Sequence, residues 1–197
     1  MVSVLEKLVT RSFDLLELFI NNNSLKPTNE AQFQFYFSHL LINNSVLFNN
    51  NTERINVYVE HTVSGIGKTC KNPNGTAICD IVLERIDLNT SSVVETAYVE
   101  LKYLGINKTC STDNRFSVLK DIEVLEHYYN SPKLGKTTCF LVVYAESSNY
   151  TTSNRSHKYT ICNNQLTQLS YTYKKKIISL KQQYTFKWKK KLLLLKV

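Results

Sequence analysis

The feature that most restricts the fold of this chain is a continuous apolar run at 138–145, with the sequence Thr-Cys-Phe-Leu-Val-Val-Tyr-Ala. The run is short for a helix, and polar and apolar residues do not alternate along it. Such a pattern is typical of a strand that is buried on both faces of a sheet. We therefore expect a central strand with other strands beside it and helices covering the sheet.

Periodicity along the rest of the chain predicts the neighbours of this strand. Helices are expected at 3–20, at 28–42 with Thr28 or Asn29 as the cap, and at 115–129. Strands are expected at 55–63, 77–86, 93–104 and 158–162, where apolar residues alternate or β-branched residues gather. Three strands in a meander, followed by a helical crossover into a buried strand, predict an α/β domain with a mixed β-sheet flanked by helices.

The charge of the chain is distributed unevenly. The formal net charge is +8, yet 147–197 contains 11 Lys and Arg and no Asp or Glu, which leaves the preceding residues with a net charge of −3. A basic segment beside an acid-containing body suggests a polyanionic partner, nucleic acid before membrane, although solvated lysines would give the same composition. No run approaches the ~20 apolar residues that span a bilayer, so we expect no membrane association.

The basic segment alternates lysines with aromatic residues. We expect 164–197 to form a Lys-rich helical extension that packs on the same domain. Lysines neutralise phosphates and aromatic rings stack on unpaired bases. Under the alternative interpretation the aromatic rings dock on the domain while the lysines face water, and we expect both to hold in part. The candidate DNA contacts are Lys174, Lys175, Lys176, Lys187, Trp188, Lys189 and Lys190.

Cysteine and asparagine patterns leave the compartment open. The five cysteines include no C-x-x-C pair, which argues against zinc, and a Cys70–Cys79 bridge remains an alternative to buried thiols. Eight N-x-S/T sequons would suit a glycosylated extracellular or virion-surface protein. However, charged residues interrupt the apolar pattern of 1–21, whereas a signal peptide has an uninterrupted apolar region. We therefore expect an intracellular protein, in the cytoplasm or in a host cell if the chain is viral.

Acidic residues interrupt the two strands of the central hairpin. Asp80 lies on the first strand, and Glu100 and Lys102 lie on the second. If the hairpin is centred on Thr90, Asp80 stands opposite Glu100 with Cβ atoms ~5 Å apart. Two carboxylates at that distance repel each other unless a lysine or a hard divalent cation lies between them. The cluster is therefore either an exposed cross-strand ion-pair network or a Mg²⁺ site suited to phosphodiester hydrolysis.

The order of elements and the sequence Glu100-Leu101-Lys102 after Asp80 resemble the PD-(D/E)XK nuclease superfamily, which has the restriction-endonuclease-like fold. The resemblance covers about 28–146. It implies that Asp80, Glu100 and the Leu101 carbonyl hold Mg²⁺, for which Mn²⁺ can substitute, and that Lys102 positions the attacking water. It also implies Glu30 as an additional metal ligand. Cys79 stands where the name-giving motif has a Pro that supplies no ligand.

These observations predict a Mg²⁺-dependent DNA endonuclease, with a helix at 1–25 before a nuclease core at 26–163. We expect a homodimer, because cutting two strands needs two sites, and no small-molecule cofactor. Glu60 and Lys120 are auxiliary candidates, with ordinary surface charge as the alternative for both. Two other functions stay open. One is a catalytically inactive nucleic-acid-binding protein on the same fold, and the other is a structure-specific nuclease of the Holliday-junction-resolvase type.

Overall fold

The computed structural model describes residues 2–65, 68–69, 71, 73–105, 112–131, 133–152, 159 and 161–197. Its helices are α1 (Val4–Asn21), α2 (Glu30–Ser45), α3 (Thr112–Tyr129) and the short 3-10 helix η1 (Ser148–Tyr150). Its strands are β1 (Glu53–Ser64), β2 (Thr76–Asp87), β3 (Ser92–Leu104), β4 (Thr137–Ala145), β5 (Ser170–Tyr173), β6 (Lys176–Ser179) and β7 (Leu192–Lys196). The helices and strands expected before residue 146 are thus confirmed, and Asn29 is the cap of α2.

The main sheet is mixed. In the described part of the chain it has five strands in the order β1-β2-β3-β4-β7. The β1–β2 and β2–β3 pairs are antiparallel. Strands β3 and β4 are parallel neighbours that are connected through α3, and β7 is antiparallel to β4. The residues at 138–145 are all buried and lie between β3 and β7, which confirms the central strand. The protein is an α/β domain with a mixed sheet flanked by helices.

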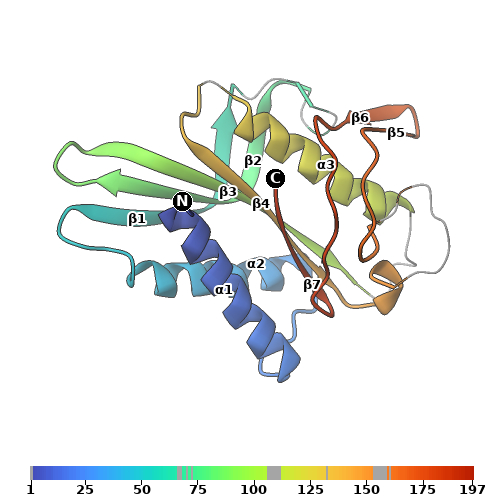
Figure 1. Cartoon of the computed structure of the whole chain (residues 1–197), viewed down its shortest axis with the longest axis horizontal. Helices are drawn as coiled ribbons and strands as arrows, with labels where there is room; N and C mark the ends of the chain where they lie inside the picture. The colour runs from blue at the N-terminus through green and yellow to red at the C-terminus, as the bar shows by residue number, and fades with distance from the viewer. Residues whose placement is uncertain are drawn as a thin grey trace.

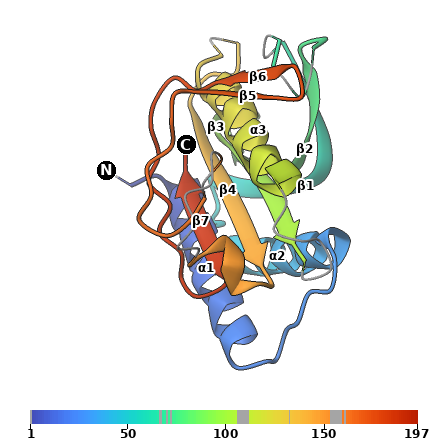
Figure 2. The ribbon, with the colours of Figure 1, turned by 90° about the vertical axis from the view of Figure 1, so that its right-hand side faces the viewer.

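Helices cover both faces of this sheet (Figures 1 and 2). On one face, α1 and α2 pack against inward residues of the strands such as Val99 and Val142. On the other face, α3 and the β5–β6 hairpin pack against Tyr98, Leu141 and Val143. Alternate residues of a strand point to opposite faces. The even-numbered positions of β3, Glu100 among them, therefore face α3.

The alternation of β2 is interrupted at Asp80. Ala77 and Cys79 belong to the core on the α3 side, whereas Ile81 and Leu83 belong to the core on the α1–α2 side. In a regular strand all four would share one face. Opposite Asp80, between the pairs Val59–Ile81 and His61–Cys79, Glu60 adopts a positive φ of 53°. The irregularity places Asp80 at the point where the two cores meet.

The helix predicted in the C-terminal segment is wrong. The described residues from Gln165 onward form β5, β6, β7 and extended connections. Tyr184, Phe186 and Trp188 are buried while the residues between them are exposed, and this period of two belongs to an extended chain rather than to a helix. The four leucines of β7 pair with β4, so the segment completes the main sheet instead of forming a helical extension. The strand expected at 158–162 lies partly outside the described residues, and the described residues 159, 161 and 162 are not in a strand.

Thiol burial argues against the bridge considered above. Cys79 and Cys139 are fully buried free thiols. Cys79 therefore takes no part in a Cys70–Cys79 disulfide, and Cys70 itself lies outside the described residues. Buried thiols of this kind act as small apolar side chains.

Candidate metal centre

The hairpin register brings Asp80 to the Glu100-Leu101-Lys102 segment. Strands β2 and β3 pair from Arg85–Glu95 to Ile81–Val99, which is the register expected for a hairpin centred on Thr90, with one shift near the turn. Beyond the pair Ile81–Val99, the side-chain carboxylate of Asp80, rather than the backbone of β2, is hydrogen-bonded to β3. Its Oδ2 accepts a hydrogen bond from the Leu101 N–H at 2.7 Å. The acid of β2 is thereby fixed beside the β3 motif.

The orientation of Leu101 follows from this hydrogen bond. The N–H and C=O of a strand residue point toward the same neighbouring strand. Since the Leu101 N–H points to Asp80, its carbonyl oxygen lies on the β2 side as well. The Leu101 side chain stands perpendicular to this direction and lies in the core under α1 and α2.

Glu100 lies at the bottom of the site and shares a cation with α3. Its side chain is 1% exposed, and its Oε2 is 3.0 Å from the Nζ of Lys71. The same Nζ is 2.9 Å from Asp121 Oδ1 on α3. Among the described residues, Glu100 Oε1 and Asp121 Oδ2 are buried atoms that lack a hydrogen-bond partner. Two buried carboxylates therefore contact one ammonium group, each through one of its two oxygens.

Lys102 links three elements at the same place. Its Nζ lies 3.4 Å from Asp121 Oδ2 on α3 and 3.4 Å from both carboxylate oxygens of Glu30. Glu30 Oε2 also accepts a hydrogen bond from the Tyr103 N–H at 3.2 Å. The first turn of α2 is thus joined to β3, and the structure brings Glu30, Lys102 and the acids of the hairpin into one cluster.

Burial and mutual repulsion shift the proton affinities of the cluster. Burial, with Asp121 and Asp80 adding repulsion against the opposing charge of Lys71, raises the pKa of Glu100 to about 8. Burial also raises the pKa of Asp80, and the Leu101 N–H and Lys71 offset this only in part. Burial alone would lower the pKa of Lys102, but Asp121 and Glu30 hold it above its ordinary value. Lys102 is therefore a permanent cation at neutral pH and not a base.

The donor set suits a hard divalent cation. Mg²⁺ prefers carboxylate and carbonyl oxygens. Glu100 Oε1 has no hydrogen-bond partner among the described residues, and Asp121 Oδ2 has only the ion pair with Lys102 at 3.4 Å. Among the described residues, no three or more His, Cys, Asp or Glu side chains form a ready-made metal site. Here Lys71, rather than a carboxylate, stands between Glu100 and Asp121.

The auxiliary candidates lie outside this cluster of contacts. Glu60 is exposed on β1, across from Asp80, with its backbone in the left-handed region. Lys120 lies next to Asp121 in sequence, but its Nζ is placed over the Phe116 ring at 5.9 Å. Their auxiliary roles stay predictions.

Sequence reasoning missed Lys71 and Asp121. The position of Asp121 could have been recognised from the sequence. It lies three residues after Val118 and four before Leu125, which places it on the apolar face of α3. A charged residue at such a position is buried only when it is paired. Lys71 comes from the connection between β1 and β2, where no periodic pattern identifies a partner.

The basic surface is only partly as expected. Lys175, Lys176, Lys187 and Lys190 are exposed. Lys174 pairs with Asp113 on α3, and Lys189 pairs with Asp14 and Glu17 on α1. These ion pairs reduce the charge that the two lysines offer to a phosphate.

The position of Trp188 does not suit the predicted stacking of its ring on a DNA base. Its side chain is buried, and its Nε1 donates to the Ile161 carbonyl at 2.6 Å. Its ring serves the core because it occupies an inward position of the extended segment.

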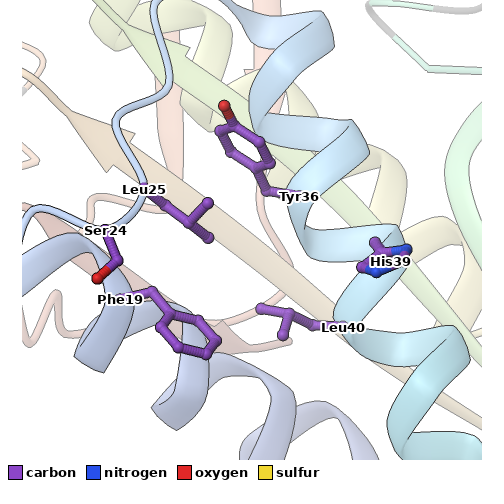
Figure 3. Close-up of a pocket in the computed structure, with 6 residues that line it drawn as sticks. All are labelled: Phe19, Ser24, Leu25, Tyr36, His39 and Leu40. Atoms are coloured by element: carbon purple, nitrogen blue, oxygen red, sulfur yellow. The ribbon is translucent and has the colours of Figure 1, made fainter.

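A separate apolar pocket of about 240 Å³ lies between α1 and α2 (Figure 3). It is lined by Phe19, Ser24, Leu25, Tyr36, His39 and Leu40. The lining contains no carboxylate and no lysine, so this pocket lacks the oxygen ligands that Mg²⁺ prefers.

Comparison with known proteins gives no relative from which a role could be transferred. The chain matches no protein-family model, no curated protein and no solved structure. In the described part of the chain, no helix has both the length and the apolar character needed to cross a membrane. The candidate site is therefore interpreted from its own geometry.

Proposed function

We propose that this protein is a Mg²⁺-dependent DNA endonuclease of the PD-(D/E)XK type, with a restriction-endonuclease-like arrangement of its α/β core. The observation that supports it best is the buried Glu100. This carboxylate has one oxygen without a hydrogen-bond partner among the described residues, and it shares the ammonium group of Lys71 with Asp121. Burying an acid in this way costs stability, and a cation site is the physical reason to keep it there.

Asp80, Glu100 and the Leu101 carbonyl are the proposed metal ligands, with Glu30 as an additional candidate at the rim. When bound, Mg²⁺ would neutralise the phosphate and supply an acidified water at neutral pH. The ammonium of Lys102 stays charged, so its proposed role is to orient the attacking water and to offset the negative charge that builds on the phosphate.

The proposed DNA partner is supported by the exposed lysines of the C-terminal segment. Lys175 and Lys176 at the β5–β6 turn, with Lys187 and Lys190, carry positive charge without an acidic residue in the same segment. Lysines of this kind contribute salt-dependent, sequence-independent affinity for the phosphate backbone. We also propose a homodimer, because two active sites are needed to cut both strands of a duplex.

The proposal is tested by cleavage of supercoiled plasmid and of a four-way junction with Mg²⁺, Mn²⁺ or EDTA. We expect cleavage with either metal and none with EDTA. Preference for the junction would indicate a structure-specific nuclease of the resolvase type. An RNA duplex of the same sequence serves as the control for DNA against RNA.

A catalytically inactive nucleic-acid-binding protein is the second candidate, and the Lys71 ion pairs favour it. Lys71 already offsets charge on Glu100 and Asp121, so the acids can be stable without metal. This candidate predicts DNA binding with a steep salt dependence and no cleavage with any divalent cation. Binding titrations at several salt concentrations, made beside the cleavage test, separate the two functions.

A further inference from the structure

Lys71 lies between two carboxylates from different elements. Its Nζ is 3.0 Å from Glu100 Oε2 on β3 and 2.9 Å from Asp121 Oδ1 on α3. One cation thus already draws both acids to a common point. Of the remaining oxygens, which are both buried, Glu100 Oε1 lacks a hydrogen-bond partner within the described structure, and Asp121 Oδ2 has only the ion pair with Lys102 at 3.4 Å. The pair can therefore take a cation that uses more oxygens than one ammonium group does.

Lys71 is also the outermost of the three groups. Its side chain is 35% exposed, whereas those of Glu100 and Asp121 are 1% and 3% exposed. It belongs to the connection between β1 and β2, so its side chain can withdraw without breaking the ladder of a strand or the bonds of a helix. A cation that arrives from solvent meets Lys71 before it reaches either acid.

The charge of the cluster favours an exchange of cations. Four carboxylates, on Glu30, Asp80, Glu100 and Asp121, face two ammonium groups, on Lys71 and Lys102. Replacing one ammonium by a divalent cation would reduce this excess of formal negative charge. A hard divalent cation also binds carboxylate oxygens directly, which an ammonium can do only through hydrogen bonds.

We propose that Asp121 is a metal ligand together with Glu100, and that Lys71 is the cation that the metal displaces when it binds. The inference rests on the proposed function, because it concerns the same metal site. In the metal-free protein Lys71 keeps the two buried acids partly neutralised. Because the metal must displace this ammonium group, Lys71 lowers the affinity of the site for the metal. The site therefore fills only at divalent-cation concentrations high enough to compete with Lys71.

The test measures Mn²⁺ affinity by electron paramagnetic resonance of free Mn²⁺, without DNA. The Lys71→Met variant is expected to bind Mn²⁺ about tenfold more tightly than the wild type, since the fraction of protein with an open site rises. Lys71→Arg keeps a cation and is expected to bind no more tightly than the wild type. Lys68→Met, an exposed lysine of the same connection, is the matched control and is expected to leave the affinity unchanged.

The role of Asp121 is isolated in the Lys71→Met background, where the lysine no longer competes. There Asp121→Asn is expected to weaken Mn²⁺ binding by about tenfold. An unchanged affinity would mean that Asp121 is only the partner of Lys71, and would overturn its role as a ligand. Near-UV circular dichroism confirms that each variant is folded.

A measurement on the wild type covers the case in which Lys71→Met does not fold. In a ¹H–¹³C NMR spectrum of lysine-labelled protein, Mg²⁺ is expected to move the Cε signal of Lys71 and to leave that of Lys68 in place. An unmoved Lys71 signal at saturating Mg²⁺ would overturn the displacement. If the wild type binds metal and cuts DNA while Lys71→Met has the same Mn²⁺ affinity, only this inference fails. If neither the wild type nor any variant binds Mn²⁺, the proposed metal site fails with it.

Discussion

The carboxylate of Asp80 accepts a hydrogen bond from the backbone N–H of Leu101 at 2.7 Å, directly beyond the last β2–β3 pair, Ile81–Val99. The bond uses Oδ2, which leaves Oδ1 as the oxygen that can meet a cation. A single contact therefore fixes the geometry of the strand acid relative to the Glu100-Leu101-Lys102 segment.

Replacing Asp80 separates the structural role of this side chain from its chemical role. Asp80→Asn keeps a hydrogen-bond acceptor for Leu101 and is expected to fold with near wild-type stability. Asp80→Ala leaves the N–H without a partner and is expected to lose about 1–3 kcal/mol of unfolding free energy. Both are expected to lower cleavage roughly 100-fold, because both remove a charge that we propose holds the metal. Urea denaturation and cleavage rates check these values, and wild-type cleavage by Asp80→Asn would contradict the role.

Lys102 and Lys120 form a matched pair of lysines near Asp121. Lys102 Nζ lies 3.4 Å from Asp121 Oδ2, whereas Lys120 Nζ lies over the Phe116 ring. Lys102→Met is expected to reduce the single-turnover cleavage rate by roughly 100-fold, since it removes the charge that we propose orients the attacking water and offsets the charge on the phosphate. Lys120→Met is expected to leave that rate within about threefold of the wild type. Equal rate losses in the two variants would point to general loss of positive charge instead.

The core of the fold and the hairpin acids could be predicted from local patterns. The apolar run that became β4 has one plausible environment, between other strands and under helices. The β2–β3 register follows from the centre of the turn, and this register is sufficient to predict that Asp80 lies beside β3. Local patterns are sufficient to predict the buried strand and the hairpin register, because both features depend on residues that are close in sequence.

The rest depended on contacts that a local pattern does not contain. Lys71 meets Glu100 and Asp121 only after three separate elements assemble. In the C-terminal segment the lysines suggested an amphipathic helix, but Tyr184, Phe186 and Trp188 are spaced by two and are buried as in a strand. The edge of β4 needed a partner strand, and that tertiary requirement decided the conformation of β7.

The raised pKa of Glu100 predicts a specific pH dependence of stability. Its pKa rises from 4.5 to about 8 on folding, so between these values the folded protein holds a proton that the unfolded chain releases. The stabilising contribution of this group is therefore present at low pH and is lost as the pH rises toward about 8. The slope for one proton is at most about 1.4 kcal/mol per pH unit.

Urea denaturation in EDTA across this pH interval checks the prediction. The wild type is expected to lose stability with rising pH relative to Glu100→Gln, which cannot release that proton. Parallel pH profiles of the two proteins would show that Glu100 ionises freely in the folded state.

The C-terminal segment is joined to α3 through hydrogen bonds to Glu126, and this contact leads to a prediction about stability. Its buried carboxylate accepts hydrogen bonds from the N–H groups of Lys181 at 2.8 Å and Gln182 at 3.2 Å, and from the Tyr184 hydroxyl at 2.9 Å. Glu126→Ala is expected to cost about 2–4 kcal/mol of unfolding free energy, since these donors lose their acceptor. Asp113→Ala, which removes an exposed ion pair from the same helix, is expected to cost less than about 0.5 kcal/mol. Similar losses in the two variants would show that Glu126 does not hold the segment.

The central claim is that Glu100 belongs to a metal site that cleaves DNA. It is tested most directly by the cleavage rate of DNA with Mg²⁺ for the wild type and for Glu100→Gln, purified in parallel and shown to be folded. We predict that the wild type cleaves DNA only when Mg²⁺ is present and that Glu100→Gln is inactive under the same conditions. Absence of cleavage by the wild type on every DNA tested, or equal cleavage by the two proteins, would contradict the account.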